Sequence, residues 1–170
     1  MTEYVTPLSI IIPVYNEEII LENAIDDLII DLNEIFIQYE IIIVENGSND
    51  STINIIEKLK LKYINLHSFH LSEPNYGKAL RKGIKSANYD YLINFSIDFI
   101  DIDFLKNALS MISKFDLIIG SKRIGNGDSR SIYRKIGTLG YNMILNLFIK
   151  MPFKCNSIII YMHLNDIRMH

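Results

Sequence analysis

The chain has 170 residues, with 17 lysines and arginines against 20 aspartates and glutamates, so its formal net charge at pH 7 is −3. Hydrophobic residues make up 49% of the sequence and charged residues 22%, which excludes an intrinsically disordered chain and predicts one folded domain over residues 1–170. The slight acidic excess argues against a protein that binds nucleic acid by neutralising phosphates. Because Cys155 is the single cysteine, an internal disulfide and a zinc site built from paired cysteines are also excluded.

Strand and helix patterns alternate along the chain. Residues 8–14 and 40–45 are short runs rich in β-branched residues, typical of strands buried on both faces. Between them, residues 18–34 place apolar side chains three and four positions apart, which predicts an amphipathic helix. The same alternation predicts further helices over 51–61, 77–87, 103–112 and 131–150, and further strands over 64–69, 91–95 and 117–120. This order predicts an α/β fold with a mainly parallel central sheet flanked by helices.

The sequence gives no sign of export or of membrane insertion. Residues 1–7 lack the basic start of a signal peptide, and no apolar run approaches the roughly 20 residues that a membrane-spanning helix needs. The apolar second half of the helix predicted over 131–150 is either core or a face that lies on a membrane or a partner. We therefore expect a cytoplasmic protein, with any membrane contact peripheral and at the cytoplasmic face.

Polar residues follow the predicted strands, at the edge where parallel α/β sheets bind ligands. Tyr15 and Glu17 follow the first strand, where a dinucleotide-binding fold would have a glycine-rich turn. The Walker pattern is also missing, which excludes the usual phosphate-binding loops of nucleotide-binding proteins. Tyr15 and the nearby acids instead suit stacking on a nucleobase and accepting its N–H hydrogen bonds, with the diphosphate carried by a divalent ion.

Four motifs lie at or near the ends of these strands. They read IIPVYNE at 11–17, IIVENGSNDST at 42–52, NYGKALRKG at 75–83 and IGSKR at 119–123. Together, and in this order within residues 8–150, they resemble the motifs of family 2 glycosyltransferases, which include dolichyl-phosphate mannose synthases and bacterial cell-surface sugar transferases. The resemblance implies a GT-A fold that binds a UDP- or GDP-linked sugar through a divalent metal.

The resemblance also implies which residues bind the nucleotide. Glu45 or Asn46 would replace the acid that reads the base, and Asn46 stands where the family usually has aspartate. Lys78 would approach the diphosphate, unless it is a solvated charge in the first turn of its helix. The nucleotide-binding residues implied in this way are Pro13, Tyr15, Glu17, Glu45, Asn46, Gly47, Lys78 and Ser96.

The metal-binding DxD motif of the family falls on Ser96-Ile97-Asp98, so its first carboxylate is missing. Asp98 keeps the position of the direct metal ligand, and the resemblance makes it both the metal-binding and the catalytic residue. Mg²⁺ or Mn²⁺ can be held by one or two carboxylates together with waters and substrate phosphates, so we expect weak metal binding. Asp101 and Asp103 form a second Asp-x-Asp pair, which we interpret as the cap of the next helix.

The acceptor site is implied by two arginines and by the C-terminal segment. Arg123 and Arg134 match family arginines near the phosphates and would hold an acceptor, although both also suit surface charges beside a loop. A polyprenyl phosphate acceptor is already anionic and needs no strong base, and a saccharide acceptor is the other option. Residues 151–170 depart from the family pattern, which predicts a short or truncated form of the enzyme.

Two interpretations from other classes stay open beside metal-assisted sugar transfer. Ser96, the atypical C-terminal segment and the short length also suit a module that derives from this fold and binds a nucleotide or a partner protein without turnover. A phosphoacceptor receiver domain would share the alternating strands and acidic loops, but it does not explain the loop at residues 13–17. In the favoured interpretation, the metal and the lysine or arginine charges stabilise the leaving nucleoside diphosphate.

Overall fold

The computed structural model describes residues 7–35, 37–120 and 160–163. Its strands are β1 (Leu8–Val14), β2 (Tyr39–Asn46), β3 (Leu66–Leu71), β4 (Tyr91–Asn94), β5 (Leu117–Ile119) and β6 (Ile160–His163). Its helices are α1 (Leu21–Glu34), α2 (Thr52–Lys62), α3 (Tyr76–Ser86) and α4 (Ile102–Met111). The chain divides into two compact units, residues 1–118 with 159–170 and residues 119–158, and the first contains every described residue except Ile119 and Gly120. The prediction of one domain over 1–170 stays a prediction.

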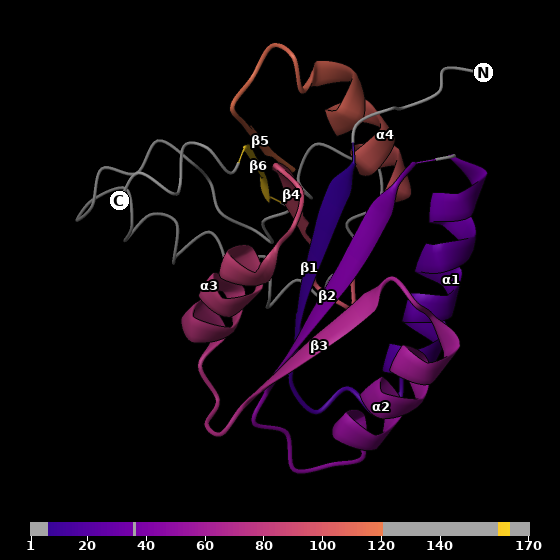
Figure 1. Cartoon of the computed structure of the whole chain (residues 1–170), viewed down its shortest axis with the longest axis vertical. Helices are drawn as coiled ribbons and strands as arrows, with labels where there is room; N and C mark the ends of the chain where they lie inside the picture. The colour runs from indigo at the N-terminus through magenta and orange to yellow at the C-terminus, as the bar shows by residue number, and fades with distance from the viewer. Residues whose placement is uncertain (1–6, 36, 121–159, 164–170) are drawn as a thin grey trace, which may run out of the picture. The chain divides into compact units, whose positions relative to one another are not determined.

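The strands form one sheet in the order β3-β2-β1-β4-β6-β5 (Figure 1). β1 lies parallel to both β2 and β4, so that Ile10 pairs with Ile41 on one side and with Ile93 on the other. β3 lies parallel to β2, whereas β6 runs antiparallel to β4. The mainly parallel sheet is therefore confirmed, and β6 is a strand that the sequence pattern did not predict.

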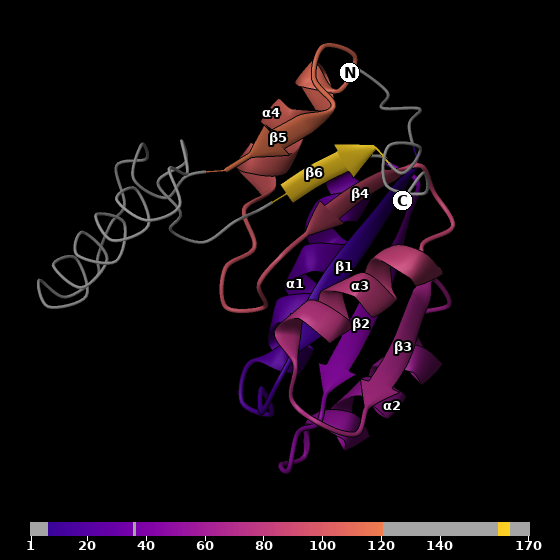
Figure 2. The same ribbon diagram turned by 90° about the vertical axis from the view of Figure 1, so that its left-hand side faces the viewer.

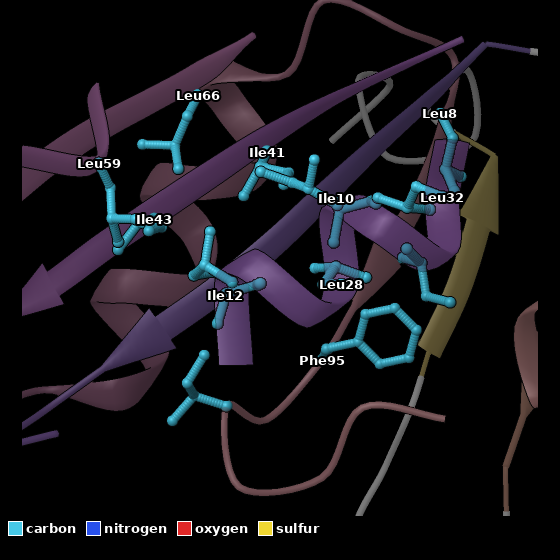
Figure 3. Packing of buried hydrophobic residues seen from close by; sticks show 14 of the residues in the cluster. Leu8, Ile10, Ile12, Leu28, Leu32, Ile41, Ile43, Leu59, Leu66 and Phe95 are labelled. Atoms are coloured by element: carbon cyan, nitrogen blue, oxygen red, sulfur yellow. The ribbon is translucent and has the colours of Figure 1, made fainter. Parts of the chain in front are cut away.

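Helices cover both faces of the sheet, as the sequence predicted. Figure 2 shows α3 lying across β1 and β2, with α1 and α2 behind the sheet. Alternate side chains of β1 enter two different clusters: Ile10 and Ile12 pack with Leu28 of α1 (Figure 3), and Ile11 packs with Ala79 of α3. Because both faces of β1 are covered, its residues form a continuous apolar run rather than an alternating one.

Local contacts decide where the helices begin. The sequence predicts α1 from Glu18, but the helix starts at Leu21, because residues 18–20 form a turn bonded to the loop after β2. At α4 the side chain of Asp101 accepts a hydrogen bond from the backbone N–H of Phe104 at 2.8 Å, which confirms the predicted cap. No helix in the described part of the chain has the length and apolar character to cross a membrane.

Candidate active site

The loops after β1, β2 and β4 meet at one edge of the sheet. These three strands are parallel neighbours, with β1 in the middle, so their carboxyl ends point the same way. Tyr15 follows β1, Gly47 follows β2, and Ser96 lies two residues beyond β4. The structure therefore brings the first two of the four motifs together with Ser96-Ile97-Asp98, the segment at the position of the DxD motif.

Asn16 is the point at which the β1 loop joins the β2 loop. Its φ is +54°, a left-handed conformation that asparagine adopts more readily than most residues. Its backbone N–H donates to Ser48 Oγ at 2.9 Å, and its side-chain Oδ1 accepts from the backbone N–H of Asn49 at 2.9 Å. The neighbouring Tyr15 is 43% exposed, so a ligand can reach it.

Three further hydrogen bonds fix the two loops to each other. The backbone N–H of Glu17 donates to Thr52 Oγ1 at 2.8 Å, and that of Glu18 donates to Asp50 Oδ2 at 3.2 Å. In return, the Glu18 carboxylate accepts from the backbone N–H of Ser51 at 2.9 Å. Asp50 also accepts from the N–H of Thr52, the first residue of α2, at 2.9 Å. The site therefore rests on a cross-linked pair of loops.

The Glu45 carboxylate is turned into the protein. Its side chain is 1% exposed, and one of its oxygens accepts from the backbone N–H of Ser48. The other oxygen lies 3.5 Å from Nδ1 of His70. These contacts suit a residue that holds the turn after β2, and base reading by Glu45 remains a prediction.

Asn46 and Gly47 connect the β2 loop to the segment that leads into α3. Asn46 Oδ1 accepts from the backbone N–H of Asn75 at 2.6 Å, and the Asn75 side chain caps α3 by accepting from the N–H of Lys78 at 2.9 Å. Gly47 has a φ of +76°, and a Cβ at this position would lie 3.0 Å from the carbonyl carbon of Glu73. These contacts fix the start of α3 to the loop after β2. Lys78 lies in the first turn of this helix and is exposed.

Carboxylates from all three loops lie near one another. Burial raises the pKa of Glu17, and the negative charges of Asp98 and Asp50 raise it further. Asp98 is exposed, and the Ser96 hydroxyl donates a hydrogen bond to one of its oxygens. A divalent cation at this edge would relieve the repulsion between the carboxylates.

The donor set here suits only a sparsely coordinated ion. Among residues 7–35, 37–120 and 160–163, no group of three or more His, Cys, Asp or Glu side chains is arranged around a common metal position. One carboxylate and one hydroxyl, Asp98 and Ser96, fit a Mg²⁺ or Mn²⁺ ion that takes its remaining ligands from water and phosphate. The metal role of Asp98 thus stays a prediction that the local chemistry supports.

The remaining predicted site residues are Pro13, Arg123 and Arg134. Pro13 is buried in β1, where it pairs with Val44 of β2. Arg123 and Arg134, the predicted acceptor residues, lie outside the described residues, as do residues 154–158 and the helix predicted over 131–150. Their placement relative to the site stays a prediction.

One polar contact near the site was not predicted from the sequence. Asn94, 5% exposed at the end of β4, donates from Nδ2 to the hydroxyl of Tyr76 at 3.2 Å. No group in the described part of the chain hydrogen-bonds to its Oδ1. An asparagine inside an apolar strand was the signal that could have shown this link between β4 and the first residue of α3.

Comparison with known proteins identifies the family. Residues 9–165 match the family model described as Glycosyl transferase family 2. The chain belongs to this family. The match includes all four motifs, and the GT-A fold expected from them agrees with the solved structures that the chain resembles.

Two curated relatives and one solved structure show the extent of the similarity. The chain is 32% identical over 157 residues to a dolichyl-phosphate beta-glucosyltransferase of Dictyostelium discoideum, covering 81% of this chain and 48% of that protein. It is 32% identical over 158 residues to a poly-beta-1,6-N-acetyl-D-glucosamine synthase of Staphylococcus epidermidis, covering 84% of this chain and 34% of that protein. Glucosyl-3-phosphoglycerate synthase from Mycobacterium tuberculosis, in complex with Mn²⁺, UDP-glucose and phosphoglyceric acid, superposes with a TM-score of 0.67 and 16% identity, covering 94% of this chain and 57% of that one. The chain thus spans half or less of the length of these two curated relatives.

Proposed function

We propose that this chain binds a nucleoside diphosphate sugar at the carboxyl edge of its sheet, for transfer of the sugar to a lipid phosphate or a saccharide. The observation that carries the proposal is the convergence of Tyr15, Asn46 and Asp98, from three strand ends, in a member of this family. The two curated relatives are named for a dolichyl-phosphate acceptor and for a polysaccharide product, which supports both acceptor classes. A lipid phosphate acceptor would place the reaction at a membrane surface.

The base is proposed to lie on Tyr15, beside the cross-linked loops. Tyr15 is 43% exposed, and an exposed aromatic ring offers a face on which a base can stack. Asn46 Oδ1 accepts one hydrogen bond from Asn75 and keeps a second lone pair for an N–H of the base. Glu17 borders the same position, and its raised pKa suits a carboxyl that shares a hydrogen bond with the ligand.

The diphosphate is proposed to lie between Asp98 and the start of α3. Asp98 and Ser96 would hold a Mg²⁺ or Mn²⁺ ion, which supplies positive charge to the leaving diphosphate when it is bound. The exposed Lys78 and the N-terminal end of α3 add positive potential on the opposite side. UDP is the nucleotide that the complex of the solved relative supports, and GDP is the alternative.

One observation favours a second function, binding without turnover. Ser96 stands where the family's first metal-binding carboxylate would be, so the metal has one charged ligand less. A domain with this change could bind a nucleotide sugar and still fail to activate it. Both functions require that the chain binds a nucleotide sugar, but only the first requires that it transfers the sugar to an acceptor.

Calorimetry separates these possibilities. We expect UDP or GDP to bind the full 170-residue chain, and to bind more tightly with Mn²⁺ than with EDTA. As a control, the surface variant Asp27→Ala should bind like the parent chain. Transfer from a radiolabelled donor to a polyprenyl phosphate would establish the enzyme. Binding without transfer would favour the binding module, and no binding of any nucleoside diphosphate would overturn both.

A further inference from the structure

His70 lies between two carboxylates from different elements. It is on β3, the edge strand, and its Nδ1 is 3.5 Å from Glu45 Oε2 of β2. Its Nε2 is 3.5 Å from Glu57 Oε1 of α2. A neutral imidazole has one N–H and one lone pair, so it can donate to only one of these oxygens, whereas the protonated ring donates to both. The ring can therefore donate to both carboxylates at once only in its protonated form.

The contact with Glu45 extends to the nucleotide site. Glu45 is 1% exposed, and a carboxylate so deeply buried is stable as an anion only with a charged or donating partner. Its second oxygen accepts from the backbone N–H of Ser48, and Ser48 Oγ accepts from the backbone N–H of Asn16 at 2.9 Å. A continuous series of contacts thus joins the His70 ring to the loop that carries Tyr15.

We propose that protonated His70 is a positioning residue, which fixes Glu45 and through it the loops that hold the nucleotide. That a nucleotide is the ligand rests on the proposed function, whereas the contacts that join His70 to Ser48 through Glu45 do not depend on it. In the described part of the chain, the charged groups that face the ring are Glu45 from β2 and Glu57 from α2, with Lys60 of α2 at 3.1 Å from the Glu57 carboxylate. Lys60 lowers the pKa of Glu57 most, and His70 lowers it further.

The proposal has a defined pH dependence. The His70 side chain is 39% exposed, so solvent reaches the ring and can exchange a proton with it. After deprotonation, a ring lone pair faces a carboxylate oxygen, and Glu45 loses its charged partner. Stabilisation of the turn is therefore present at low pH and lost as the pH rises, and nucleotide affinity should fall in the same direction.

NMR of the ligand-free chain tests the link without any nucleotide. We expect the Ser48 amide resonance to move between pH 5 and 8.5 with the same midpoint as the His70 ring. This movement should disappear in His70→Gln and persist in His67→Gln, a matched control on the same strand whose Nε2 lies 3.7 Å from Glu40. A Ser48 amide that ignores pH, or that titrates equally in His70→Gln, would overturn the proposal.

Nucleotide affinity provides the second measurement. We expect UDP with Mn²⁺ to bind about twofold to fivefold more weakly to His70→Gln than to the parent chain at pH 5.5, the range of a half-exposed ion pair. The difference should vanish at pH 8.5, and His70→Arg, which keeps its charge, should retain the tighter binding there. The arginine variant also serves if His70→Gln fails to fold by circular dichroism. If UDP binds all variants equally at both pH values, His70 has no positioning role. If UDP does not bind at all but the Ser48 amide still titrates with His70, only the proposed function is contradicted.

Discussion

At the scale of single residues, strand geometry assigns different tasks to two adjacent polar side chains. Glu45 and Asn46 both end β2, and successive side chains of a strand point to opposite faces of the sheet. Glu45 therefore contacts His70 on the side of α2, and Asn46 contacts Asn75 on the side of α3. The sequence predicted that polar residues gather here but could not separate the two, because the separation depends on what packs on each face.

The ring of Tyr15 is expected to supply a large part of the base affinity. Tyr15→Ala should weaken nucleoside diphosphate binding by about 1–3 kcal/mol, the range of a base stacked on an aromatic side chain. Tyr15→Phe keeps the ring and should bind like the parent chain. Isothermal titration of both variants measures the difference, and an unchanged affinity in a folded alanine variant would remove Tyr15 from the site.

Asp98 is expected to provide the metal-dependent part of binding. Asp98→Ala should leave only the weak binding that is seen without metal, whereas Ser96→Asp should strengthen the effect of Mn²⁺, because a second carboxylate adds a charged ligand beside the diphosphate. Titrations with Mn²⁺ and with EDTA give the metal increment for each variant. An equal increment in the parent chain and in Asp98→Ala would refute the assignment.

At the scale of elements, the patterns with local causes were predicted and those with distant causes were not. Apolar periodicity predicted both ends of β1 as observed. It predicted the ends of the other strands and helices within residues 7–120 to within about three residues. The predicted start of α1 at Glu18 was wrong, because the backbone N–H of Glu18 donates to the Asp50 carboxylate in the loop after β2. β6 was missed because it is defined by antiparallel pairing with β4, which lies more than 60 positions away in the sequence.

The close approach of α3 to the sheet is a testable property of one glycine. A Cβ at Gly83 would lie 2.4 Å from Ile11 Cγ2, which is buried in β1, and 3.3 Å from Val44 Cγ2. Gly83→Ala should lower the free energy of unfolding by about 1–2 kcal/mol, since the overpacking cost exceeds the gain in helix propensity. Urea unfolding measures this change.

Gly77 in the same helix provides the control. Among the described residues, its added Cβ would meet only Asn75 Oδ1, at an ordinary 3.6 Å. Gly77→Ala should therefore be neutral or slightly stabilising. Equal loss of stability in the two variants would show that the tight contact with Ile11 is not the cause.

At the scale of the whole molecule, ligand binding and folding are linked. A ligand that binds only the folded chain, at about 100 times its dissociation constant, adds about 2.7 kcal/mol to the free energy of unfolding. For a chain of this size, that energy corresponds to a rise in unfolding temperature of about 5–11 °C. We expect UDP with Mn²⁺ to give such a rise, and we expect Asp98→Ala to lose the part of the rise that depends on Mn²⁺.

Ile10→Ala is the control in the hydrophobic core, because Ile10 is 0% exposed and lies within the hydrophobic cluster. This variant should lower the unfolding temperature with and without ligand, but the rise caused by UDP with Mn²⁺ should stay the same. Scanning calorimetry of the three proteins measures these effects, and a cooperative transition that UDP with Mn²⁺ does not move would contradict a nucleotide site on this sheet.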